Sequence, residues 1–215
     1  MGLADDMVQD LISAHPGHPL RVAIDGVTAS GKSTCARWLV NAIAAQGRPA
    51  IHVTMDGFHH RRAHRYLQGR TSATGYYQDA YDFDALCRYV LIPLGPNGTG
   101  EIQRRTIDLA SDEPVEDSPE PVPVDAIVVV DGTFLHRSPL PDNWDYSVFI
   151  DTPMDVARAR GIARDADALG GTEAAGRAFD QRYHAACRIY LDEVEPRTRA
   201  TRVVPGIDSL LSTGR

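Results

Sequence analysis

Apolar residues follow two patterns in this chain, and the two patterns alternate along it. Short continuous apolar runs, typical of strands buried on both faces of a parallel sheet, occur at 20–25, 50–54, 126–130 and 146–150. Between and around them lie longer stretches whose apolar residues recur at helical spacing. Alternation of this kind predicts an α/β domain, with a parallel sheet covered by helices.

The helical pattern also gives the approximate extent of each helix. Helices are predicted at 3–14, 32–46, 82–94, 153–168 and 173–194. Gly47 ends the second of them, and Gly170 with Gly171 separates the last two. A short strand at 201–204 and a weakly structured tail complete the chain. A length of 215 residues suits one domain over 1–215, and no internal repeat is visible.

Three segments fall outside this alternation. Residues 57–78 are rich in His and Arg and hold no carboxylate, which is typical either of a solvated surface loop or of a flap over an anionic ligand. The sequence leaves both interpretations open. Residues 101–109 suit an exposed strand or hairpin. Residues 111–123 are acidic and Pro-rich, so we expect a surface connection without a functional role.

Composition and charge exclude several classes of protein. A net charge of −7 argues against a general binder of nucleic acid or of anionic membranes. The first 19 residues lack the basic start of a signal peptide, and no run approaches the ~20 apolar residues of a membrane span, so we expect a cytoplasmic protein. Its three cysteines fit neither a disulfide framework nor a zinc site, and we expect them to be buried. The oligomeric state stays open, a homo-oligomer included.

The segment GVTASGKST at 26–34 has the spacing G-x-x-x-x-G-K-[ST] of a phosphate-binding loop. A predicted strand precedes it and a predicted helix follows it, which is the context that this motif requires. Such a loop surrounds nucleotide phosphates with backbone N–H groups, sets Lys32 against the β and γ oxygens, and offers the Ser33 hydroxyl to Mg²⁺. Lys32 is the only lysine in a chain with 21 arginines. We expect the nucleotide to be bound by Gly26, Val27, Thr28, Ala29, Ser30, Gly31, Lys32, Ser33 and Thr34.

Acidic residues follow the predicted strands. Because ligands bind outside the carboxyl ends of parallel strands, Asp25, Asp56 and Asp131 are all candidates to face one crevice. Asp131, at the end of an entirely apolar strand, best fits a carboxylate associated with Mg²⁺. Asp151 also ends a strand, but it precedes a predicted helix, so a capping role is expected.

The predicted helix at 153–168 carries Arg160 and Arg164 four positions apart on one face. These two arginines either pair with nearby aspartates on a wet surface or point at transferring phosphates, as lid arginines do. The helical spacing alone does not decide between the two.

With these pieces in place, the chain resembles the uridine kinase and phosphoribulokinase group of phosphate-loop kinases across about residues 20–205. Four segments carry the resemblance, the last of them a pair: GVTASGKST at 26–34, MDGFHH at 55–60, QDAYDFDAL at 78–86, and VVVDGTFL at 128–135 with FIDTPMDVARARGIARD at 149–165. The resemblance implies the P-loop NTPase three-layer sandwich, in which a five-stranded parallel sheet has helices on both faces. It also implies a small hairpin insertion near 101–110 and a lid around 158–170.

Carried over by position, the resemblance gives individual residues their roles. Ser33 and Asp131 hold Mg²⁺, and Asp56 accepts the proton of the attacking hydroxyl close to the metal. Lys32, Arg160 and Arg164 act on the transferring phosphoryl group. The acceptor is expected to contact His59, Arg62, Tyr76, Tyr77 and Arg182.

This chain departs from the group at several of those positions. Its Asp131 stands where the group more often has Glu, which shortens the reach by one methylene. Where uridine kinases have an acid that reads the ribose, it has Tyr76 or Tyr77. Ile107 and Asp112 replace the aromatic residue and the histidine of the pyrimidine pocket. The change at Asp131 leaves its role at the metal in place, whereas the other departures concern the identity of the substrate.

The activity that the resemblance implies is ATP- and Mg²⁺-dependent phosphoryl transfer to a hydroxyl of a small molecule, first of all the 5′-OH of a pyrimidine nucleoside. One alternative is a kinase of an anionic acceptor such as pantothenate, glycerate or a sugar phosphate, motivated by the basic stretch within 57–78. Another, of a different class, is a phosphate-loop regulatory protein that binds nucleotide and acts through a partner.

Overall fold

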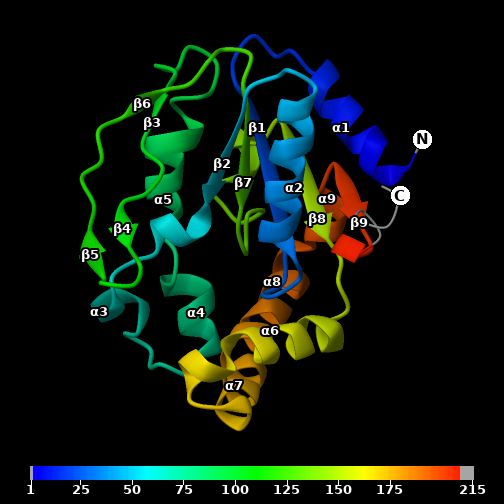
Figure 1. The fold of residues 1–215 in the computed structure, drawn as a ribbon. Coiled ribbons are helices and arrows are strands. Elements are labelled where there is room, and N and C mark those ends of the chain that lie inside the picture. The colour runs from blue at the N-terminus through cyan, green and yellow to red at the C-terminus, as the bar shows by residue number, and fades with distance from the viewer. Residues whose placement is uncertain (1, 209–215) are drawn as a thin grey trace.

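The computed structural model describes residues 2–208 and is built around a five-stranded parallel sheet (Figure 1). The strand order is β2-β7-β1-β8-β9. These strands are β1 (Leu20–Gly26), β2 (Ala50–Thr54), β7 (Ile127–Asp131), β8 (Tyr146–Ile150) and β9 (Arg202–Val204). The four apolar runs and the last short strand predicted from the sequence are thus confirmed to within one residue at either end.

Helices cover both faces of the sheet. The helices α1 (Leu3–Ser13) and α2 (Lys32–Ala45) pack on one face against alternate residues of the central strands, such as Val22 and Ile24 of β1. The other face packs on α5 (Phe83–Leu86), on the π-helical turn Cys87–Leu91 that continues it, and on α8 (His184–Val194). The strands β1 and β7 are buried at every position, which explains their continuous apolar runs.

A helical arm extends past the carboxyl edge of the sheet (Figure 1). It consists of α6 (Met154–Leu169), α7 (Thr172–Ala178) and the π-helical turn Phe179–Tyr183, which runs on into α8. The break between α6 and α7 falls at Gly170 and Gly171, whose φ angles of 86° and 106° favour glycine. Shorter helices complete the fold: α3 (Arg62–Arg65), α4 (Ala73–Asp79), α9 (Pro196–Arg199), and single turns at Met55–Phe58 and Pro141–Asn143.

The predicted hairpin near 101–110 is part of a larger insertion. In it, β3 (Glu101–Ile102) pairs with β6 (Glu120–Pro121), and β4 (Ile107–Asp108) pairs with β5 (Glu113–Pro114), both antiparallel. The acidic segment 111–123 is mostly exposed, as expected of a surface connection, and it also supplies β5 and β6, the returning half of this insertion. Two-residue pairings held by main-chain bonds leave no pattern of apolar side chains to read.

Other expectations concern single residues and the chain as a whole. Cys35, Cys87 and Cys187 are free and buried, as predicted. Within residues 2–208, no helix is both long enough and apolar enough to cross a membrane. The end of the predicted tail, 209–215, lies outside the described residues.

Candidate active site

The phosphate-binding loop joins the end of β1 to the start of α2. Gly26 has a φ of 154°, and a Cβ atom there would lie 2.7 Å from Ser30 Oγ and 2.8 Å from the carbonyl oxygen of Ile150. Only glycine fits that position. Gly31, with a φ of 100°, is the N-cap of α2, so the first N–H groups of this helix face the loop.

Lys32 is folded back under the loop. Its Nζ donates to the carbonyl oxygen of Val27 at 2.8 Å, and its side chain is buried. Burial lowers the pKa of Lys32 below the ordinary value, and the nearby acidic groups, Asp131 and Asp56 among them, only partly oppose this shift. The negative charge of a nucleotide phosphate next to this amine would stabilise its protonated form.

Asp131, at the end of β7, is held from two sides. Ser33 Oγ donates to one carboxylate oxygen at 2.5 Å, and His52 Nε2 lies 2.7 Å from the other. Burial acts to raise the pKa of Asp131, but the hydrogen bonds from His52 and Ser33 and the charge of Lys32 hold it below the ordinary value. An ionised carboxylate beside a serine hydroxyl is a donor set of hard oxygens, which fits Mg²⁺.

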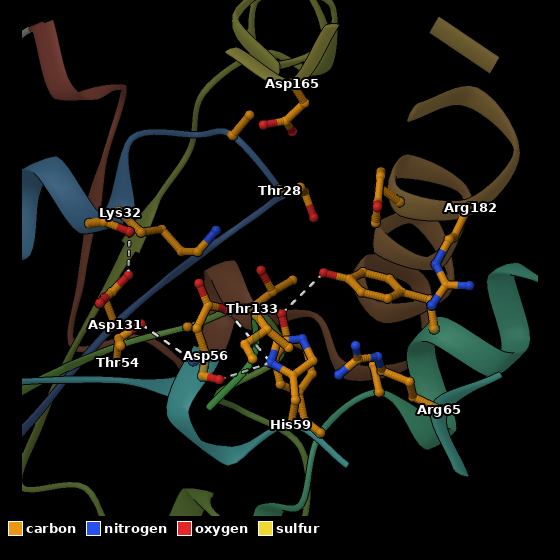
Figure 2. A pocket seen from close by; sticks show the side chains of 18 of the residues that line it. Thr28, Lys32, Thr54, Asp56, His59, Arg65, Asp131, Thr133, Asp165 and Arg182 are labelled. Atoms are coloured by element: carbon orange, nitrogen blue, oxygen red, sulfur yellow. Dashed lines mark hydrogen bonds and ion pairs between the residues drawn. The ribbon is translucent and has the colours of Figure 1, made fainter. Parts of the chain in front are cut away.

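A cavity of about 380 Å³ opens at the carboxyl edge of the sheet. The phosphate loop, the ends of β2 and β7, the segment after β2, and the helical arm all contribute to its wall. In Figure 2, Lys32 and Asp131 lie on one side of the cavity and Arg65 and Arg182 on the other, with Asp56 between them. The cavity therefore has a phosphate-loop end and an arginine end.

Asp56 stands in the open part of this cavity. It lies in the helical turn that follows β2, where its backbone N–H donates to Thr54 Oγ1 at 3.3 Å. Its carboxylate side chain is 66% exposed and lies 3.9 Å from His59 Nδ1. Burial lowers the pKa of His59; Asp56 acts to raise it, and the charges of Arg65 and Arg182 lower it further. The neutral His59 ring thus lies beside the Asp56 carboxylate, which is accessible to a hydroxyl group of a molecule bound in the cavity.

Most of the residues predicted for the site meet at this cavity. Those that line it are Thr28, Ala29, Lys32, Ser33, Asp56, His59, Tyr76, Asp131, Arg164 and Arg182. Arg164, from α6, forms an ion pair with its neighbour Asp165 at 2.7 Å, and both face the cavity. The roles assigned to these residues remain predictions.

Eight predicted site residues do not line the cavity. Five of them belong to the phosphate loop, Gly26, Val27, Ser30, Gly31 and Thr34, and the other three lie elsewhere. Arg160 forms an ion pair with Asp208 at 2.6 Å and is not part of the cavity wall, although it lies one turn from Arg164. Arg62 is exposed, and its guanidinium donates to the carbonyl oxygen of Ala110 in the hairpin insertion. Tyr77 turns away from the cavity, and its hydroxyl donates to Glu193 on α8.

Two expectations about aspartates were wrong. Asp25 does not face the crevice: it is fully buried beneath the loop, accepting from the Gly26 N–H and pairing with His136 Nδ1, both at 2.7 Å. Asp151 does not cap α6, because Pro153 is the N-cap of that helix and Asp151 is paired with Arg197 at 2.7 Å.

The sequence did not single out several residues of the cavity. These are Tyr66, Tyr81, Thr133 and Tyr183. Arg65 lies within the basic segment 57–78, so the segment carried a signal, but nothing in the spacing separated this inward arginine from the exposed ones. His52, which positions Asp131, lies on a predicted strand without any motif.

Comparisons with known proteins agree with this geometry. The profile of the Phosphoribulokinase / Uridine kinase family matches residues 22–204. A protein named uridine kinase from Leuconostoc citreum is 26% identical over 195 residues, which cover 86% of each chain.

Two solved structures bear on the fold. One is described as a possible uridine kinase from Bacillus stearothermophilus; it has a TM-score of 0.73 at 23% identity and is matched over 93% of this chain and 96% of its own. The other, phosphoribulokinase from Rhodobacter spheroides, has a TM-score of 0.57 at 19% identity, over 86% of this chain and 68% of its own. The expected P-loop fold is confirmed. Because the profile spans most of its length, the chain belongs to the Phosphoribulokinase / Uridine kinase family.

Proposed function

We propose that this protein transfers the γ-phosphoryl group of ATP, in the presence of Mg²⁺, to a hydroxyl of a small molecule bound in the cavity. One observation carries the proposal. The buried amine of Lys32, the paired Ser33 and Asp131, and the exposed Asp56 carboxylate all line the same 380 Å³ space. A phosphate-binding end and a hydroxyl-activating group thus share one cavity.

Each group has a defined part in this reaction. The loop amides and Lys32 bind the phosphates of ATP, and Arg164 adds positive charge from α6. Ser33 and Asp131 would hold Mg²⁺, with Asp56 close by; the ion supplies neutralisation of charge on the phosphate oxygens. Phosphoryl transfer requires mostly positioning and such charge neutralisation.

The proton balance falls to Asp56. The acceptor oxygen forms a bond to the γ-phosphorus, while the bond from that phosphorus to the β–γ bridging oxygen breaks. ADP leaves with the electron pair of the broken bond, and Asp56 takes the proton of the acceptor hydroxyl. The exposure of Asp56 to the cavity supports this role.

Two acceptor classes have support. The relatives named uridine kinase support the 5′-OH of a pyrimidine nucleoside. Against this acceptor, the cavity wall has the phenol of Tyr76, hydrogen-bonded to Tyr81 at 3.1 Å, where a carboxylate would read a ribose. Asp112, at the position of the histidine of the pyrimidine pocket, already accepts a hydrogen bond from the backbone N–H of Arg62. The buried arginines Arg65 and Arg182 at the far end of the cavity support an anionic acceptor.

The Asp56→Asn variant tests the proposed function. Turnover in an ADP-release assay with a panel of hydroxylated acceptors should fall roughly 10²- to 10⁴-fold, the usual size of a general-base contribution. The Kd for a non-hydrolysable ATP analogue should stay unchanged. Asp192→Asn, an exposed change on α8, is the matched control. ATP turnover that needs no acceptor and survives in Asp56→Asn would instead indicate the regulatory, partner-dependent alternative.

A further inference from the structure

Arg182 is a buried cation at the arginine end of the cavity, and no carboxylate in residues 2–208 forms an ion pair with it. Its side chain is 5% exposed and lines the cavity. Its guanidinium donates to the carbonyl oxygen of Arg70 and lies 4.8 Å from the centre of the Tyr66 ring and 5.2 Å from that of Tyr76. Among the described residues, it forms no ion pair within 4.0 Å. Carbonyl and ring contacts orient a guanidinium but leave its charge uncompensated.

Arg65 places a second buried guanidinium against the same ring. It is 6% exposed, lines the cavity, and lies 5.4 Å from the centre of Tyr66. Its acid partner is Asp112, 3.4 Å away, whose carboxylate also accepts the N–H of Arg62 at 2.9 Å. Asp112 is thus shared between the buried Arg65 and the exposed Arg62, and among the described residues no carboxylate lies within 4.0 Å of Arg182. Such an excess of like charge is costly in a partly dehydrated space unless a further anion enters it.

The position of this pair separates it from the ATP phosphates. Figure 2 shows Lys32 and Asp131 on the opposite side of the cavity from Arg65 and Arg182, with Asp56 and His59 between the two groups. Both arginines act to lower the pKa of His59, so their field reaches the space next to Asp56. An acceptor whose hydroxyl meets Asp56 would extend its other end toward the arginines.

We infer that Arg65 and Arg182 form a subsite for an anionic group of the acceptor, a phosphate or a carboxylate, at the end of the molecule remote from the hydroxyl that is phosphorylated. The inference rests on the proposed kinase function and replaces the neutral nucleoside as its acceptor. Guanidinium forks suit both anions, because their N–H groups can donate in parallel to two oxygens. Both guanidiniums lie against the ring of Tyr66.

The test measures binding of paired ligands that differ only in the anion. With Mg²⁺ and a saturating non-hydrolysable ATP analogue present, isothermal titration would compare ribose 5-phosphate with ribose, glycerate with glycerol, and uridine by itself. We expect at least one charged ligand to bind roughly tenfold or more tightly than its neutral counterpart, the size expected of charge-assisted hydrogen bonds. Which pair shows this preference distinguishes a phosphate subsite from a carboxylate subsite.

Variants then assign the preference to the arginines. Arg182→Gln should reduce the charged-to-neutral ratio to near one, and Arg182→Lys should restore part of it. Both should leave the Kd of the ATP analogue unchanged. Arg177→Gln removes an exposed arginine of α7 that pairs with Glu173, and should change nothing. Circular dichroism would confirm that each variant is folded, and Arg65→Gln provides a second route if Arg182→Gln is not.

The two hypotheses fail in different ways. If no charged ligand binds more tightly than its neutral counterpart, or if uridine alone binds, the anion subsite is overturned while the kinase proposal stands. A preference that persists in both Arg182→Gln and Arg65→Gln overturns it as well. Failure of the ATP analogue to bind contradicts the proposed function, and the same titrations without nucleotide would still report on the subsite.

Discussion

Replacing Tyr190 by phenylalanine removes one oxygen atom from the network beneath the phosphate loop. The Tyr190 hydroxyl is fully buried, donates to the carboxylate of Asp25, and accepts the backbone N–H of His136 at 3.1 Å. Asp25 in turn accepts the N–H of Gly26, the first residue of the loop, at 2.7 Å. Phenylalanine keeps the ring and its packing, so the change isolates these two hydrogen bonds, together with a longer contact of 3.4 Å from the hydroxyl to His136 Nδ1.

The expected cost follows from those two bonds. A hydrogen bond to a charged group contributes about 1.5–3 kcal/mol, and a buried N–H left unpaired, here that of His136, costs about 1–3 kcal/mol. Since the two terms share one oxygen and are not strictly additive, we expect a loss of about 3–4 kcal/mol in the free energy of unfolding. For a chain of this length, that corresponds to a Tm lowered by roughly 6–15 °C.

Calorimetry and denaturant titration would measure this loss, with Tyr89→Phe as the control. Tyr89 packs against the same core cluster, and no hydrogen bond of its hydroxyl occurs among the described residues, so its loss should stay within about 0.5 kcal/mol. Tyr190→Phe should also weaken binding of an ATP analogue, because Asp25 helps to fix Gly26. A Tyr190→Phe protein as stable as Tyr89→Phe would refute the reasoning, since it would mean that the buried network contributes nothing.

Two further predictions address the phosphate loop and the helical arm. Because burial lowers the pKa of Lys32, the reactive neutral form of its amine should exist at lower pH than in an exposed lysine. Labelling with cyanate at a series of pH values, followed by peptide mass spectrometry, should show an apparent pKa below the ordinary lysine value. Bound MgATP should suppress the labelling. An ordinary or raised value would contradict the burial argument. Gly161→Ala should lower stability by about 1–3 kcal/mol despite the helix propensity of Ala, because its Cβ would overlap the ring of Phe179, which is fully buried. Gly176→Ala is the comparison, because the new Cβ would lie no closer than 3.3 Å to any other atom, in this case Arg158 Nη2. The Tm of this variant should be equal to or higher than that of the unchanged protein.

Those parts of this protein that depend on local pattern could be predicted from the residues alone. Strands buried on both faces must be apolar at every position, so the four runs were visible without a structure. The phosphate loop was equally plain, because its backbone needs glycine at Gly26 and Gly31 and its ligand needs an amine at a fixed spacing. Asp56 and Asp131 followed from the rule that parallel strands present their carboxyl ends to one crevice.

Tertiary structure decided what depends on partners distant in the chain. Asp25 ends a strand just as Asp131 does, but it points beneath the loop, where it meets His136 and Tyr190, 111 and 165 positions away. Arg182 joins Arg65 only because the helical arm returns across the segment that follows β2. A side chain's direction at a strand end, or on a helix of mixed polarity, is set by which buried groups can satisfy its charge. The groups that pair with such a charge come from distant parts of the chain, so the pairing leaves no periodicity in the sequence.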